Sequence, residues 1–170
     1  MRLHWLVPFC LCCSLAAAQH ADRNLVANPG FEDMHESKVE GWTWRPGRAN
    51  ATMAVDDKVA HSGKRSVRLT NTTEKAPHVY GLLSQDVPVV PKQTYTLSCY
   101  VRSEAPGVAW IGGGSRWQYR FHFARTGQEW KRVLGTVTTE PGQTDFRIVI
   151  LTESPTRALW IDDVQRRTHQ

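Results

Sequence analysis

Residues 95–102 read Tyr-Thr-Leu-Ser-Cys-Tyr-Val-Arg, so that larger apolar side chains alternate with mainly polar ones. Successive side chains of a β-strand point to opposite faces of its sheet, and this period of two predicts a strand with one buried face. The inward set is expected to be Tyr95, Leu97, Cys99 and Val101, and the outward set Thr96, Ser98, Tyr100 and Arg102. Cys99 is interpreted as a small buried apolar side chain.

Similar short segments, rich in Val, Ile, Thr and aromatic residues, recur along the chain. Turn residues such as Pro88, Pro91 and the Gly112–Gly114 run separate them, and no helical pattern stands out. The predicted strands are residues 42–45, 51–55, 65–70, 80–87, 95–102, 108–111, 119–123, 131–138, 145–152 and 158–164. Many short strands without intervening helices predict an all-β fold, an antiparallel sandwich or barrel.

Two further strands show the same alternation. In residues 119–123 the expected inward set is Tyr119, Phe121 and Phe123, which leaves Gln118, Arg120 and His122 outward. In residues 145–152 one face carries Phe146, Ile148 and Ile150, and the other Arg147, Val149 and Leu151. Outward sets that mix Tyr, Arg, His and Gln favour a sheet face that binds something polar.

Residues 1–18 are typical of a signal peptide. Arg2 supplies the positive end, an apolar stretch follows, and Ala16-Ala17-Ala18 fits a small-residue cleavage site. The apolar stretch is short for a bilayer span, which needs about 20 residues. We therefore expect a secreted, extracellular protein with no membrane attachment after cleavage. Cys99 then remains as the only cysteine, too few for an internal disulfide or a zinc cluster.

The net charge is +5, and the Lys and Arg residues are spread along the chain without forming a stripe. No helix-turn-helix, zinc finger or aromatic nucleic-acid platform accompanies them, so a nucleic-acid partner is not expected.

Five phrases, in this order and spacing, resemble the jelly-roll carbohydrate-binding modules of families four, nine and twenty-two. They are Asn24-Leu-Val-Ala-Asn-Pro-Gly-Phe-Glu32, Gly41-Trp42, His61-Ser-Gly-Lys-Arg-Ser66, Trp130 within Gln128-Glu-Trp-Lys-Arg132, and Leu159-Trp-Ile-Asp-Asp-Val164. The resemblance runs from about Asn24 to Val164 and implies one galactose-binding-like domain over residues 24–166. It implies an antiparallel β-sandwich of the jelly-roll type and a non-catalytic domain that binds a polysaccharide or oligosaccharide.

The resemblance also implies a structural calcium ion. Carried across residue by residue, the ligands would be Glu32 and Asp162 (or Asp163), with backbone carbonyls of Gly30, His61 and Lys64. Calcium prefers several oxygen ligands of this kind. Such an ion would tie the first strand to the last.

The apolar C–H faces of sugar rings stack on aromatic side chains, while their hydroxyls need planar polar partners. The candidate ligand-binding residues are Trp44, Tyr100, Trp110, Trp117, Gln118, Arg120 and His122. The resemblance places core tryptophans at Trp42 and Trp130, and Trp160 is expected in the core as well.

Two other functions fit a jelly roll. The trio of Tyr100, Arg120 and His122 is similar to the neutralising and acid–base groups of jelly-roll polysaccharide lyases, so a small lyase or glycoside hydrolase is one alternative. A protein-binding adhesion domain is the other, because fold alone does not determine function. These modules are usually attached to a catalytic domain, so a domain of this kind is expected to act alone or alongside separately encoded glycan-degrading enzymes.

Overall fold

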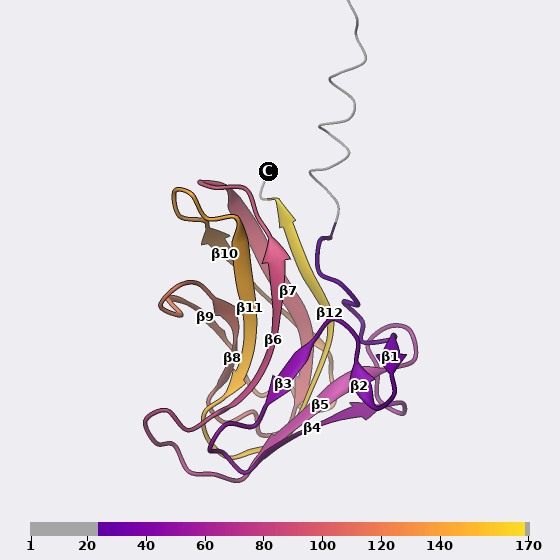
Figure 1. The fold of residues 1–170 in the computed structure, drawn as a ribbon. Coiled ribbons are helices and arrows are strands. Elements are labelled where there is room, and N and C mark those ends of the chain that lie inside the picture. Colours follow the sequence, from indigo (N-terminus) through magenta and orange to yellow (C-terminus); the bar gives the residue numbers. More distant parts are fainter. Residues whose placement is uncertain (1–23, 169–170) are drawn as a thin grey trace, which may run out of the picture.

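The computed structural model describes residues 24–168, and the predicted signal peptide lies outside this range. Two five-stranded antiparallel sheets pack face to face as a sandwich (Figure 1). The first, called the β7 sheet, has the order β10 (Lys131–Thr138), β7 (Thr94–Ser103), β12 (Thr156–Thr168), β5 (Ser66–Asn71), β4 (Ala51–Asp56). The second, called the β11 sheet, has the order β3 (Thr43–Arg45), β6 (Gly81–Pro88), β11 (Asp145–Thr152), β8 (Ala109–Gly113), β9 (Tyr119–His122).

A small hairpin of β1 (Met34–His35) and β2 (Lys38–Val39) completes the described elements. It was not predicted, whereas each of the ten predicted segments overlaps one of the other strands. The prediction of an all-β sandwich of the jelly-roll type is confirmed. Residues 24–168 contain no helix, and so none long and apolar enough to cross a membrane.

The core lies between the sheets and confirms the alternation in β7 and β11. Tyr95, Leu97, Cys99 and Val101 are buried, as are Phe146, Ile148 and Ile150. Burial raises the pKa of the Cys99 thiol well above its ordinary value, so this cysteine is an inert apolar side chain. In β9, Tyr119 and Phe121 are half-buried and pack against the core from the edge, while Phe123 is buried.

The three predicted core tryptophans have different environments. Trp42 is buried beside Phe31, and its indole N–H donates to the carbonyl of Asn28 at 3.1 Å. Trp130 and Trp160 are half-buried and lie outside the core, so their assignment was wrong. Trp160 occupies an outward position because its strand neighbours, Leu159 and Ile161, take the inward ones.

Candidate functional site

A second apolar cluster lies on the outer face of the β11 sheet, away from the core. It consists of four buried residues, Leu82, Trp110, Val149 and Leu151. The residues next to them along the strands point the opposite way, into the sandwich. Tyr80 and Trp117, each half-buried, pack over this cluster and cover it. A covered apolar floor on an outer sheet face is typical of a ligand cleft.

Trp110 forms the floor and has no exposed surface of its own. Its indole N–H donates to Oε1 of Glu153 at 2.9 Å, and the guanidinium of Arg120 lies 5.2 Å from its ring centroid. Lys75 forms an ion pair with the other carboxylate oxygen of Glu153, at 3.5 Å. Trp110 therefore positions its neighbours and offers no face to a ligand.

Trp117 is the aromatic side chain that a ligand can reach. It closes the turn that follows β8, where its amide donates to the carbonyl of Gly114 at 3.1 Å, and it adopts a left-handed backbone conformation with φ of 53°. This conformation is costly for a bulky residue, and such strain often occurs at functional sites. The carbonyl of Trp117 accepts a 3.0 Å hydrogen bond from Nε of Arg120, which helps to hold the turn.

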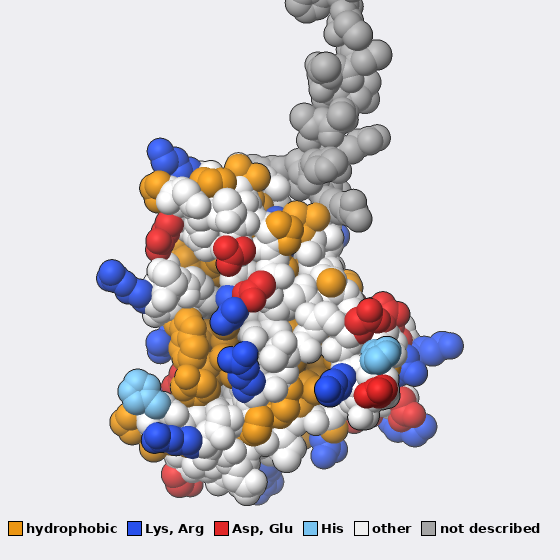
Figure 2. All heavy atoms as spheres, in the orientation of Figure 1, with side chains coloured by type: hydrophobic (Ala, Val, Ile, Leu, Met, Phe, Trp, Pro, Cys, Tyr) orange, Lys and Arg blue, Asp and Glu red, His pale blue; other side chains and the backbone are white. Residues whose placement is uncertain are grey.

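Three neighbouring hollows lie on this face of the β11 sheet, and together they are called the cleft. The first is lined by Tyr80, Trp117, Arg120 and Glu153, and it shares Trp117 with the second. The second shares Asp86 and Arg147 with the third, which reaches Thr43 and Arg45 on the edge strand β3. Figure 2 shows this face, with an apolar patch over β8 and β9 beside side chains of both charges.

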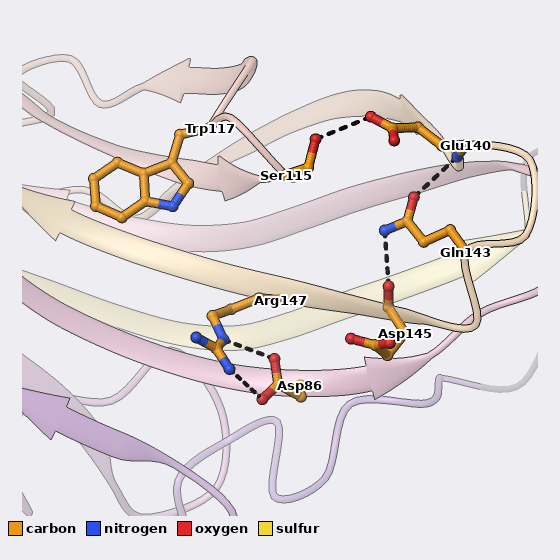
Figure 3. A pocket seen from close by; sticks show the side chains of 8 residues that line it. Asp86, Ser115, Trp117, Glu140, Gln143, Asp145 and Arg147 are labelled. Carbon is orange, nitrogen blue, oxygen red and sulfur yellow. Dashed lines mark hydrogen bonds and ion pairs between the residues drawn. The ribbon is translucent and has the colours of Figure 1, made fainter.

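Polar groups in the middle of the cleft are held in fixed positions (Figure 3). Arg147 donates through Nε and a terminal nitrogen to the two carboxylate oxygens of Asp86, both at 2.8 Å. The hydrogen bonds from Arg147 lower the pKa of Asp86, and the same pair raises the pKa of Arg147. Ser115 donates to Glu140 at 3.0 Å on the facing rim. Fixed planar groups beside an aromatic ring are suited to hydroxyl-rich ligands.

The structure brings together five of the seven predicted ligand-binding residues. They belong to β8, β9 and the turn between them: Trp110, Trp117, Gln118, Arg120 and His122. Gln118 and His122 are exposed, and Gln118 accepts a 3.1 Å hydrogen bond from the amide of Arg116. His122 lies opposite Trp110 in the strand register.

Trp44 and Tyr100 lie elsewhere. Trp44 is in register with the inward-facing Leu83 and packs against the core, so Thr43 and Arg45 are the cleft-facing residues of β3. Tyr100 belongs to the β7 sheet, where its ring stacks on His61 with centroids 3.6 Å apart. The prediction that Tyr100 shares one face with Gln118, Arg120 and His122 was wrong, because the two sets face outward from different sheets.

Sequence reasoning missed Tyr80, Asp86 and Arg147 as cleft residues. Asp86 was not among the candidate residues, and Arg147 was placed only on the strand face opposite Phe146. The available signal was their opposite charge within two neighbouring predicted strands. Their pairing requires the register of β6 and β11, in which Arg147 stands opposite Asp86.

The acids of the predicted calcium site come together at one end of the sandwich. Oε1 of Glu32 accepts backbone hydrogen bonds from Lys64 and Arg65, at 2.7 and 3.0 Å. Oδ2 of Asp162 accepts them from His61 and Ser62, at 2.8 and 3.1 Å. The loop of residues 61–65 therefore bridges the two carboxylates. Desolvation by burial raises the pKa of Asp162 to about 6.

Three acids converge beside Gly30. A side chain at Gly30 would contact three acids at once, since its Cβ would lie 3.6 Å from Asp162 Oδ1, 3.7 Å from Asp163 Oδ1 and 3.8 Å from Glu32 Cγ. Within residues 24–168 no three His, Cys, Asp or Glu side chains form a metal cluster by themselves. Backbone carbonyls would therefore have to complete a calcium shell.

The family model of the carbohydrate binding domain of families 4 and 9 matches residues 23–158. The chain therefore belongs to this family of carbohydrate-binding domains. No curated protein matches the chain significantly in sequence.

Solved structures support the same fold. The CBM22-1 xylan-binding domain of Paenibacillus barcinonensis Xyn10C is 22% identical with a TM-score of 0.63, over 87% of this chain and 96% of that one. TmCBM61, in complex with β-1,4-galactotriose, is 20% identical with a TM-score of 0.61, over 86% and 99%. The active domain of bacteriophage CBA120 tailspike protein 4 is 15% identical with a TM-score of 0.62. The match covers 86% of this chain but only 21% of the tailspike chain.

Proposed function

We propose that this chain is a secreted, non-catalytic domain that binds a polysaccharide or oligosaccharide along the cleft of the β11 sheet. The observation that carries the proposal is Trp117, half-exposed and held in a left-handed conformation at the junction of two hollows. Its ring offers a stacking surface, while Asp86, Arg147 and Arg120 supply hydrogen-bonding groups beside it. Secretion rests on the signal-peptide pattern of residues 1–18.

The ligand is proposed to be a glycan chain that lies across the strands, because the hollows follow one another from β9 to β3. The xylan-binding and galactotriose-bound relatives make xylan and β-1,4-galactan the first polymers to test, with β-glucan and mannan beside them. Affinity should be modest, on the order of micromolar to millimolar, because each hydrogen bond replaces one that water supplies.

The test is affinity electrophoresis and calorimetry with these polymers. Trp117→Ala and Arg147→Gln should each lose binding, while Arg48→Gln, an exposed arginine on the β3–β4 turn, should bind like wild type. The proposal is wrong if Trp117→Ala binds like wild type. Its non-catalytic part is wrong if sugar is released from any polymer and His122→Ala abolishes that release. The separation of Tyr100 from Arg120 and His122 favours binding over a lyase.

We also propose that calcium holds Glu32 and Asp162 together, with carbonyls of Gly30, His61 and Lys64 completing the shell. Asp162 is buried, and a bound ion would offset the negative charge of its carboxylate there. The support is the convergence of acids from both ends of the domain around Gly30. Its expected effect is on stability, because an ion that binds only the folded chain stabilises it.

A further inference from the structure

The outer face of the other sheet, the β7 sheet, carries a row of side chains that the cleft does not use. In this row Arg102, Trp160 and Arg68 stand side by side on β7, β12 and β5, each in register with the next. Adjacent strands are about 4.8 Å apart, so the backbones of the two arginines lie about 10 Å apart with the indole between them. Arg132 faces outward on β10, opposite Tyr100 and so one outward position along from Arg102. These four residues are called the arginine face.

Trp160 is fixed in place although it is half-exposed. Its indole N–H donates to Oδ2 of Asp56 at 2.8 Å, and the guanidinium of Arg102 lies 5.5 Å from its ring centroid. Arg102 also donates to Gln128. A tryptophan whose position is already fixed loses little entropy when a ligand covers it.

The charge of the face is mainly positive. Arg167 adds a fourth arginine, on β12, whereas the acids on this side of the sheet are the half-buried Asp56, the buried Asp162 and the half-buried Asp163. Among residues 24–168 no carboxylate lies within ion-pair distance of Arg68, Arg102 or Arg132. Arg132 donates instead to the hydroxyl of Ser98, at 3.0 Å. The pKa of nearby Asp56 is lowered mainly by the hydrogen bond from Trp160, and the charge of Arg68 helps to lower it. Planar guanidinium groups that form no ion pair are suited to bind carboxylates from outside.

We propose that the arginine face is a second binding surface, for a polysaccharide that carries uronic acids. The carboxylates would bind Arg68 and Arg102, and the apolar face of a sugar ring would stack on Trp160 between them. A sugar ring accounts for the indole as well as the arginines, which an acidic peptide would leave without a partner. The face lies on the opposite side of the sandwich from the cleft, so the proposal is independent of the cleft's ligand.

The test compares the full chain in gels that contain polygalacturonate or highly methyl-esterified pectin, which share a backbone but differ in free carboxylates. Wild type should be retarded by polygalacturonate, less by the ester, and less again at high salt. Arg68→Gln with Arg102→Gln should weaken binding at least about tenfold, the loss expected when a charge-assisted contact is removed. Arg68→Lys with Arg102→Lys should fall between, since charge remains but the planar fork is lost.

The matched control is Arg48→Gln with Lys92→Gln, which removes the same charge from two exposed turns. It should bind polygalacturonate like wild type, and so should the cleft variant Trp117→Ala. The arginine-face double variant should retain any binding of neutral glycans and an unchanged melting temperature. If that variant unfolds, the lysine pair replaces it in the comparison.

Four outcomes would overturn the proposal. The first is that polygalacturonate does not retard wild type, and the second is that the Arg48/Lys92 control loses as much binding as the arginine-face variant. The third is that polyglutamate or dextran sulfate competes as well as polygalacturonate does. The fourth is that Trp117→Ala loses polygalacturonate binding while the arginine-face variant keeps it. The second and third would mean that net charge or an acidic protein segment is recognised. The fourth would place the uronate in the cleft and leave the cleft's own function intact.

Discussion

The indole rings of Trp110 and Trp117 lie edge to face with their centroids 6.0 Å apart, although the first is fully buried and the second half-exposed. One forms the floor of the cleft and the other its reachable wall. This division of roles predicts that the same substitution will act on stability at one position and on binding at the other.

Trp110→Ala should destabilise the fold by about 3–5 kcal/mol, as for other large buried aromatics. Trp117→Ala should cost only about 1–2 kcal/mol, because part of its surface is already in water. Trp117→Gly should be more stable than Trp117→Ala by about 1 kcal/mol, since glycine adopts a φ of 53° without strain. Urea denaturation of the three variants checks this, and equal losses for Trp110 and Trp117 would contradict it.

Asp86→Asn should flatten the loss of stability in acid. Hydrogen bonds from Arg147 hold the pKa of Asp86 below 3.8 in the folded protein, so the unfolded chain takes up this proton first. The contribution is present above about pH 4 and is lost as pH falls through the lower, folded pKa. Melting temperatures between about pH 6 and 2.5 should fall more steeply in wild type than in Asp86→Asn. Asp57→Asn, which is exposed, is the control and should match the wild-type slope.

A chelator should lower the melting temperature, and added Ca²⁺ should restore it. Glu32→Ala should remove this response, because Glu32 is one of the two proposed carboxylate ligands, whereas the neighbouring exposed Asp33→Ala should keep it. Differential scanning calorimetry of the three proteins measures both effects. A melt that is the same with chelator and with Ca²⁺ in wild type would exclude the ion.

Trp42→Ala and Trp130→Ala should differ sharply. Trp42 is buried and hydrogen-bonded to Asn28, so its truncation should cost about 3–5 kcal/mol. Trp130 contacts His61 at its edge, with centroids 5.7 Å apart, and remains half-exposed, so its truncation should cost about 1 kcal/mol. Chemical denaturation decides between this expectation and an equal structural role for both.

The sequence was sufficient for the class of fold and for which side chains of a strand point inward. Alternation correctly placed Leu97 and Tyr100 on opposite faces of one strand, and Ile148 and Arg147 on opposite faces of another, because one face of each strand packs into the core. Alternation does not say which sheet a strand joins, so Tyr100 and Arg120 were grouped although they point outward from opposite sides of the sandwich. The strand order, set by contacts between distant segments, carries that information.

The tryptophans show a second limit. Trp160 was expected in the core, whereas its place between the inward Leu159 and Ile161 puts it outward, where Asp56 accepts a hydrogen bond from its N–H. Val149 and Leu151 stand on the outer face of their strand and are nevertheless buried, because the cluster they belong to is covered by Tyr80 and Trp117. A strand pattern cannot reveal a cover that comes from another part of the chain.

The position of β12 has a consequence for how the chain is made. The strand lies between β7 and β5, in the middle of its sheet, yet it is synthesised after every other strand described. Until residues 156–168 have left the ribosome, β7 and β5 each lack a hydrogen-bonding neighbour, and the inward side chains of both strands have no completed sheet around them. Unpaired edges of this kind are prone to aggregate. We therefore expect folding to follow release of the whole domain, and nascent chains that stop before β12 to be held by chaperones or degraded.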